Sequence, residues 1–234
     1  MAAWLWCFVS WSAVAVVLVQ GGDIRSLYAD LFRNYFKDVR PSNTASEPAE
    51  VTMSLGLRSI DFDPKKGALK INALLKLTWI DYRLRWYPPS YKNADTIYVN
   101  ADKLWLPDIV LYNAMAPTRD VVNALATVSH DGHVVYKSSK IYSAICDAAS
   151  PSTVHQCNLK FGSWIYSGDE LDLVLDDMDK NQTFPYLDTT DYVESHFLEL
   201  ISTNATRVVM YYACCPEPYV DVQHRLNLRV KDEK

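Results

Sequence analysis

The spacing of apolar side chains changes once along the chain, from a helical period to a strand period. In residues 23–39 apolar side chains recur every three or four positions, on one face of a helix: Ile24, Leu27, Tyr28, Leu31 and Tyr35. Residues 41–50 are rich in Ser, Thr, Ala and Pro and predict a loop. From residue 51 apolar residues alternate with polar or small ones, which predicts strands: Val51, Met53, Leu55 and Leu57 begin this pattern.

Turn signals separate the predicted strands. Residues 63–67, Asp-Pro-Lys-Lys-Gly, join the first strand to a returning one over residues 68–79. At Asp131-Gly132 a hairpin is predicted, because Gly takes the positive φ that most residues avoid. Residues 176–195 are polar, contain a proline and predict a mobile loop. Many short strands with turns between them favour an all-β sandwich or barrel. Further strands are expected over residues 121–129, 134–145, 159–165, 170–175, 197–212 and 219–230.

The amino-terminal segment has the character of a secretory leader. Residues 4–19 carry no charge, and the first Lys or Arg of the chain is Arg25. A membrane-spanning signal anchor is the alternative, but the stretch is shorter than the ~20 apolar residues that a span needs. We expect residues 1–22 to be a signal peptide and residues 23–234 to form one secreted, extracellular domain. No later stretch reaches the length of a span, so a soluble product is expected.

Composition and motifs exclude several classes of function. The net charge of −5 disfavours a nucleic-acid partner, because phosphate binding needs a basic face. No nucleophile elbow, phosphate loop or zinc protease motif occurs in the sequence. We therefore expect a protein that is not an enzyme and that needs no cofactor.

Two groups of residues raise the question of a metal. Asp177, Asp179 and Asn181 resemble the start of a calcium loop, but Gln182 and Asp188 occupy positions where such a loop has Gly and Glu. His130 and His133 flank a turn, where histidines are usually solvated. We expect no metal site.

The cysteines and sequons also suit an exported chain. Without Cys7 in the leader, an even number of cysteines remains and implies two disulfides with three possible pairings. Adjacent Cα atoms lie ~3.8 Å apart, below the ~4.4 Å lower edge for ordinary disulfides. Geometry alone would therefore pair Cys214 and Cys215 each with a distant partner. Asn181 and Asn204 are glycosylation acceptors.

Three tracts gather aromatic rings: residues 105–112, 161–168 and 211–219. For any one tract a role in the core is the more usual one. Together, the motifs Trp-x-Pro-Asp, Gly-Ser-Trp-x-Tyr-Ser-Gly and Cys-Cys-Pro-Glu-Pro-Tyr, in this order and spacing, resemble the acetylcholine-binding proteins. These are soluble relatives of the extracellular domain of nicotinic receptors and other Cys-loop channels. The resemblance extends from Asp23 to the end and includes residues 79–86.

The resemblance implies a fold, an assembly and a site. It implies a β-sandwich of about ten strands with an amino-terminal helix, assembled as a homopentamer with sites between subunits. It pairs Cys146 with Cys157 and Cys214 with Cys215, the second pair at the tip of a flexible hairpin. On the principal face of one subunit, a cage of rings would hold small cations such as acetylcholine, nicotine-like agonists or peptide antagonists: Tyr112, Trp164, Tyr212 and Tyr219.

The neighbouring subunit would supply a complementary face made of Leu74, Thr127, Val135 and Lys137. Two of these depart from the family pattern. Leu74 replaces the usual aromatic ring, and Lys137 introduces a positive charge. We expect Lys137 to lower affinity for small cations, or to select ligands with an acceptor that its ammonium can reach.

Two rival interpretations remain. The first is a receptor subunit whose membrane domain has been cut away. Against it, residues 150–153 give the disulfide loop a polar tip, which suits a protein without a membrane domain. The second is a secreted hydrolase or lectin-like sandwich, for which the sequence supplies no catalytic set.

Overall fold

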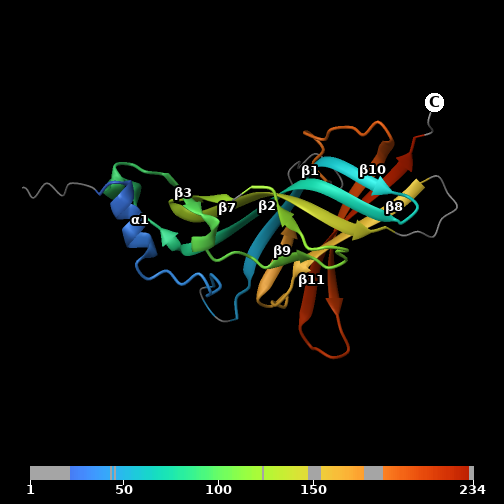
Figure 1. Ribbon diagram of the computed structural model, residues 1–234. Helices are drawn as coiled ribbons and strands as arrows, with labels where there is room; N and C mark the ends of the chain where they lie inside the picture. Colours follow the sequence, from blue (N-terminus) through green and yellow to red (C-terminus); the bar gives the residue numbers. More distant parts are fainter. Residues whose placement is uncertain are drawn as a thin grey trace, which may run out of the picture.

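The computed structural model describes residues 22–42, 44, 46–122, 124–146, 154–176 and 187–231, so nearly all of the expected signal peptide lies outside it. Within this part, one α-helix precedes eleven strands (Figure 1). No helix in it is long and apolar enough to cross a membrane. The elements are α1 (Ile24–Phe32), β1 (Ala49–Asp63), β2 (Ala68–Arg85), η1 (Pro88–Tyr91), β3 (Thr96–Asn100), η2 (Ala101–Lys103), β4 (Ile109–Leu111), β5 (Arg119–Asp120), β6 (Leu125–Ser129), β7 (Asp131–Ile145), β8 (Val154–Ser163), β9 (Leu171–Leu175), β10 (Leu198–Tyr211) and β11 (Pro218–Val230).

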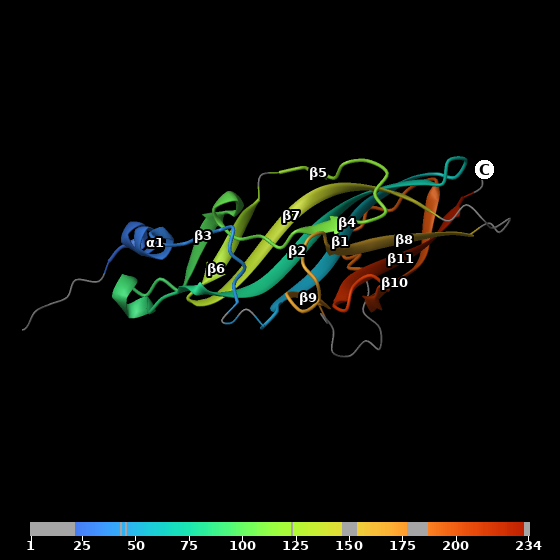
Figure 2. The same ribbon diagram turned by 90° about the horizontal axis from the view of Figure 1, so that it is seen from below.

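The strands form two sheets, which confirms the predicted β-sandwich. The larger sheet has the order β3-β6-β7-β2-β1-β9, with β5 paired to β7, and the smaller has the order β10-β11-β8-β4. Only β1 and β9 pair in parallel among the described strands. Figure 2 shows β8, β10 and β11 grouped together, with α1 at the far end of the molecule.

The two-residue period of the sequence appears as alternating burial. In β1 and β2 every second side chain is buried between the sheets, including Met53, Leu55, Leu75 and Leu77. The two predicted turns are present, with Gly67 at φ 62° and Gly132 at φ 86°. A Cβ on Gly132 would also lie 2.6 Å from the carbonyl oxygen of Asp81, so this turn requires glycine twice over.

The helix is shorter than predicted, ending at Phe32 rather than at residue 39. Beyond it, the guanidinium of Arg83 donates from its Nη1 to the carbonyls of Phe36 at 3.1 Å and Val39 at 2.7 Å. This tertiary contact holds the linker that follows the helix, and periodicity alone does not reveal it.

A buried carboxylate anchors this linker to β2. Asp81 is fully buried, and its carboxylate accepts two hydrogen bonds from Arg83, from Nε at 2.8 Å and from Nη2 at 2.7 Å. The Tyr35 hydroxyl also donates to Asp81, at 2.8 Å. Such a fully bonded charge fixes the start of the chain against the larger sheet.

Other boundaries differ from the predicted ones. Strand β6 starts at Leu125 rather than at residue 121, since the Val121 amide instead bonds the carbonyl of Ser139 at 2.8 Å. Of the predicted mobile loop, residues 177–186 lie outside the described part. Residues 187–195 are not a free loop, because the Asp188 amide and carbonyl bond β1 at 3.0 and 2.7 Å, and Leu187 is buried.

Candidate functional site

Four aromatic side chains from three separate tracts gather at the smaller sheet. Tyr112 follows β4, Trp164 follows β8, and Tyr212 and Tyr219 lie at the two sides of the β10–β11 hairpin. The ring centroids of Tyr112 and Trp164 are 6.5 Å apart, and those of Tyr212 and Tyr219 are 5.6 Å apart. The two pairs lie in the same part of the smaller sheet, because Asp221, two residues after Tyr219, pairs with Gly162, which packs against Tyr112. The structure thus brings together the four rings that the resemblance singled out.

Asp108 positions Trp164 by bonding the residues on both sides of it. The Ser163 hydroxyl donates to one carboxylate oxygen at 2.6 Å, and the Ile165 amide donates to the other at 2.7 Å. Strand β8 therefore ends at Ser163 instead of continuing to residue 165 as predicted. The Trp164 side chain is left 73% exposed, which is unusual for a large ring with no role at the surface.

Tyr112 lies against the backbone of β8. Its amide bonds the carbonyl of Lys160 at 2.8 Å, and its hydroxyl donates to the carbonyl of Ser163. Burial, followed by the nearby carboxylates of Asp221 and Asp108, raises the pKa of Tyr112 to about 12. The phenol therefore stays protonated at neutral pH and keeps its role as a donor.

A buried ion pair lies beneath the rings. Asp221 is 3% exposed, and its carboxylate is 3.1 Å from the ammonium of Lys160. That ammonium is also 5.8 Å from the centroid of the Tyr112 ring. The pair neutralises itself, and beside the rings the carboxylate of Glu217 accepts from the Tyr219 hydroxyl at 3.4 Å.

Gly162 makes room for the Tyr112 ring, and this predicts a steric effect. A Cβ at Gly162 would lie 2.5 Å from the Tyr112 hydroxyl oxygen and 2.6 and 2.7 Å from two atoms of the ring. We expect Gly162→Ala to displace the ring and to weaken binding of a quaternary amine about tenfold, ~1.4 kcal/mol. Gly56→Ala is the matched control, because its added Cβ would meet nothing closer than 3.6 Å. Equal affinities for the two variants in a calorimetric titration would show that Tyr112 does not contact the ligand.

The disulfides have the pairing that the resemblance implied. Cys146 joins Cys157, which ties the end of β7 in one sheet to β8 in the other. Cys214 joins Cys215 at the tip of the β10–β11 hairpin. The argument from ordinary disulfide geometry, which favoured distant partners for these two cysteines, was wrong because such geometry does not cover neighbouring residues.

Peptide mapping without reduction tests this pairing. We expect Cys214 and Cys215 within one looped peptide, and Cys146 joined to Cys157. A peptide that links one pair to the other would contradict the hairpin and with it the position of Tyr212 and Tyr219.

The residues assigned to a complementary face lie on the larger sheet instead. Leu74 is on β2, Thr127 on β6, and Val135 and Lys137 on β7. Leu74, Thr127 and Val135 are partly buried and Lys137 is exposed. These four residues therefore belong to a different sheet from the rings. A ligand site that contains both sets of residues would have to form between two chains.

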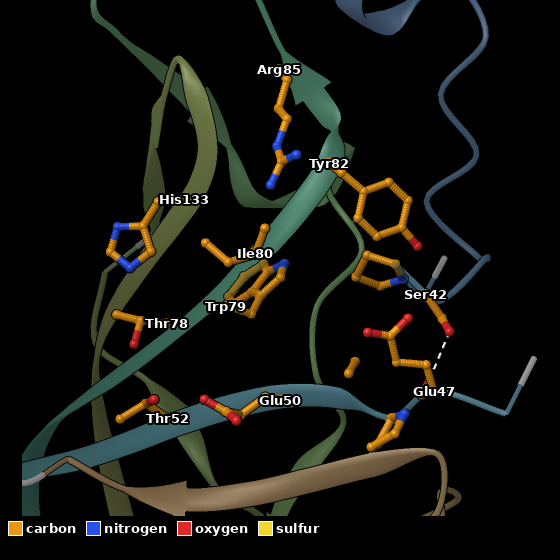
Figure 3. Close-up of a pocket in the computed structure, with 13 residues that line it drawn as sticks. Ser42, Glu47, Glu50, Thr52, Thr78, Trp79, Ile80, Tyr82, Arg85 and His133 are labelled. Atoms are coloured by element: carbon orange, nitrogen blue, oxygen red, sulfur yellow. Dashed lines mark hydrogen bonds between the residues drawn. The ribbon is translucent and has the colours of Figure 1, made fainter. Parts of the chain in front are cut away.

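A cavity of about 400 Å³ lies farther along the same larger sheet (Figure 3). It is lined by β1, β2, β7 and the linker that follows α1, and Thr78 and Ile80 of β2 are among the lining residues. Polar side chains surround it, with the carboxylates of Glu47 and Glu50 on one side and Arg85 and His133 on the other. None of the four rings lines this cavity.

Some of the possible metal ligands and glycosylation sites lie within the part of the chain that the structure describes, and others lie outside it. Residues 177–186 of the calcium-like run, with Asn181, lie outside the described part. Within it, no group of three or more His, Cys, Asp or Glu side chains is placed to hold a metal ion. Asn204 is exposed on β10, the edge strand of the smaller sheet, where a glycan has room.

The residues that hold the rings in place were not identified from the sequence. Asp108 and Ser163 stood inside the recognised tracts, and the polarity of Ser163 next to Trp164 was an available signal. Lys160 and Asp221 lie 61 positions apart, and only the pairing of β8 with β11 brings them together. Trp105 belongs to the core, 3% exposed and edge-on to Trp79, although its tract also contains Tyr112.

Comparison with known proteins gives a consistent result. Residues 24–231 match the profile of the neurotransmitter-gated ion-channel ligand binding domain. Acetylcholine receptor subunit alpha-L1 of Schistocerca gregaria is 35% identical over 217 residues, which are 89% of this chain and 39% of that protein. Neuronal acetylcholine receptor subunit alpha-9 of Rattus norvegicus is 32% identical over 230 residues, which are 96% of this chain and 47% of that protein.

The similarity is not confined to subunits named alpha. Acetylcholine receptor subunit beta-like 2 of Drosophila melanogaster is 32% identical over 216 residues, 89% of this chain and 42% of that protein. This chain spans less than half the length of these receptor subunits.

Proposed function

The chain belongs to the family of neurotransmitter-gated ion-channel ligand-binding domains, and we propose that it binds small cationic amines such as acetylcholine in its four-ring cage. The family consists of receptors rather than enzymes, in agreement with the expectation from the sequence. The proposal further places each site between two subunits of a ring, five in number by resemblance. It also makes the chain a secreted extracellular protein with a cleaved leader at residues 1–22.

The exposed cluster of Tyr112, Trp164, Tyr212 and Tyr219 is the observation that carries this proposal. A quaternary amine has no proton to donate, but the negative face of an aromatic ring attracts it. Each contact contributes ~0.5–2 kcal/mol, and Trp is the strongest partner. Four rings together with burial reach roughly micromolar affinity or tighter.

The proposed site needs a second chain. Trp164 is 73% exposed and Tyr212 47% exposed in the single chain, so a ligand resting on them would remain open to water. Small-molecule sites bury most of the ligand surface. A neighbouring subunit that presents Leu74, Thr127, Val135 and Lys137 would complete the enclosure.

The alternative is the extracellular domain of a channel subunit. It is favoured by the names of the relatives, which are receptor subunits and more than twice as long as the matched region. Both alternatives use the same cage and differ in what the transcript encodes after Lys234. Sequencing that transcript distinguishes them: a stop codon supports the soluble protein, and further coding sequence with apolar spans of ~20 residues would support the channel.

A titration tests the shared part of the proposal. Residues 23–234 are titrated with acetylcholine, with nicotine and with a peptide toxin, and tryptophan emission is followed because Trp164 lies in the cage. Light scattering on the same sample gives the number of subunits. We expect saturable changes with a particle of several chains. Absence of a saturable change with all three ligands, on an intact assembly, would contradict the proposal.

A further inference from the structure

The cavity lined by β1, β2 and β7 has walls that local contacts hold in place (Figure 3). On one side, the loop that follows α1 closes on itself, because the Ser42 hydroxyl and Arg40 Nη1 each donate to the carbonyl of Glu47 at 2.7 Å. On the other side, Arg85 Nε donates to the carbonyl of Asp131 at 2.7 Å. The volume of about 400 Å³ is within the range of small-molecule sites. The cavity is therefore formed by one chain alone.

Two hydrogen-bond donors of this wall have no partner among the residues that the structure describes. They are the indole nitrogen of Trp79 and the hydroxyl of Tyr82, and both atoms are buried. Trp79 as a whole is 3% exposed. Figure 3 shows the nitrogen edge of Trp79 turned to the side on which Tyr82 and Glu47 lie. Because a buried donor without a partner is destabilising, these two groups favour an acceptor supplied from the cavity.

Carboxylates stand beside these donors. Glu47 and Glu50 line the same cavity, and neither carboxylate has an ion pair or hydrogen bond within the described part of the chain. Thr52 and Thr78 add hydroxyl groups, and the guanidinium of Arg85 is on the opposite side (Figure 3). Since the walls carry charges of both signs, a ligand with a single charge would be attracted by one side and repelled by the other.

We propose that this cavity binds a neutral polyhydroxyl ligand, either a free monosaccharide or the terminal sugar of a glycan. A hydroxyl group donates and accepts hydrogen bonds at once, so neighbouring sugar hydroxyls accept from Trp79 and Tyr82 and donate to Glu47 and Glu50. An anion would meet the two carboxylates, and a cation would leave both donors unpaired. The site is separate from the ring cage, so this inference does not rest on the proposed function.

Ligand-observed NMR with saturation transfer tests the chemistry of the ligand. The assembled protein is titrated with glucose, mannose and N-acetylglucosamine, which are neutral, and with glycine and acetate, which carry charges. We expect saturable binding of at least one sugar and none of glycine or acetate. Saturable binding of glycine or acetate, with no sugar bound, would overturn the inference.

Tyrosine variants locate the binding. Tyr82→Phe removes one donor and keeps the ring, and the variant should fold as the parent does, because the hydroxyl has no partner among the described residues. We expect sugar binding to weaken at least fivefold. Tyr87→Phe is the matched control, since Tyr87 is exposed and does not line this cavity. Sugar affinities that are equal in the two variants would overturn the assignment to this cavity.

Removal of the N-linked glycans distinguishes the two sources of sugar. If a glycan of the protein occupies the cavity, free sugars bind only after enzymatic deglycosylation. If the ligand is a free sugar, the parent binds it before and after this treatment. Absence of saturable binding of all three sugars to the intact assembly, before and after, would overturn the inference.

Acetylcholine titration of Tyr82→Phe separates this cavity from the ring cage. The variant should bind acetylcholine within threefold of the parent in calorimetry, because Tyr82 is not one of the four rings. If sugars do not bind but acetylcholine does, the sugar site is wrong and the proposed function stands.

Discussion

Replacing Trp164 by alanine is expected to weaken binding of acetylcholine by about 2–4 kcal/mol, at least 30-fold, while the assembly persists. The side chain is 73% exposed, so its removal leaves no cavity in the core. What is lost is the strongest cation–π partner and the apolar contact of the largest ring. A fluorescence readout would be compromised by removal of the reporter, so calorimetry is the suitable measurement.

Ile165→Ala provides the matched control. Ile165 is the adjacent residue and is equally exposed, at 73%, but it has no ring. Its removal should change affinity less than threefold. If Trp164→Ala also stays within threefold of the parent on an intact assembly, the cage hypothesis fails.

Acid is expected to destabilise the fold by roughly 3 kcal/mol through a single buried histidine. His224 on β11 is 1% exposed, and neither of its ring nitrogens has a hydrogen-bond partner among the residues that the structure describes. Burial lowers the pKa of His224 from 6.5 to about 4. Between these two pH values His224 is protonated in the unfolded chain but stays neutral in the folded chain. Stability is therefore complete above about pH 6.5 and falls by about 1.4 kcal/mol per pH unit as pH drops towards 4.

Urea unfolding at a series of pH values measures this loss. His224→Leu should flatten the profile between pH 6.5 and 4, because an apolar side chain suits a site that contacts Phe161 and pairs with Ala205 and Leu159. His133→Gln, a change at a partly exposed histidine, should leave the profile unchanged. Parallel profiles for the parent and His224→Leu would show that other groups cause the acid sensitivity.

Much of the fold followed from local signals. The two-residue period from Val51 and the turns at Gly67 and Gly132 predicted strands and hairpins correctly, because alternation and positive φ are properties of short segments. The path of the chain after α1 was not predictable in this way, since it depends on Arg83, far along the chain, whose guanidinium bonds the carbonyls of Phe36 and Val39.

The candidate site shows the same division. The rings of Tyr112, Trp164, Tyr212 and Tyr219 were found through motifs in continuous tracts. The supporting contacts were not, because Lys160 reaches Asp221 only through strand pairing. The pairing of Cys214 with Cys215 came from the resemblance, because ordinary disulfide geometry favoured distant partners. Features of short segments could therefore be predicted from the sequence, and contacts between distant segments could not.

A structure of the assembled protein with acetylcholine bound, by crystallography or electron cryomicroscopy, tests the central claim most directly. The account predicts one ligand at each contact between chains, with its quaternary nitrogen within about 6 Å of the centroids of Trp164 and at least two of the three tyrosine rings. Lys137 of the neighbouring chain would lie on the opposite side of the ligand. A ligand found instead in the cavity bounded by Glu50, Ile80 and His133, with the rings unoccupied, would contradict it.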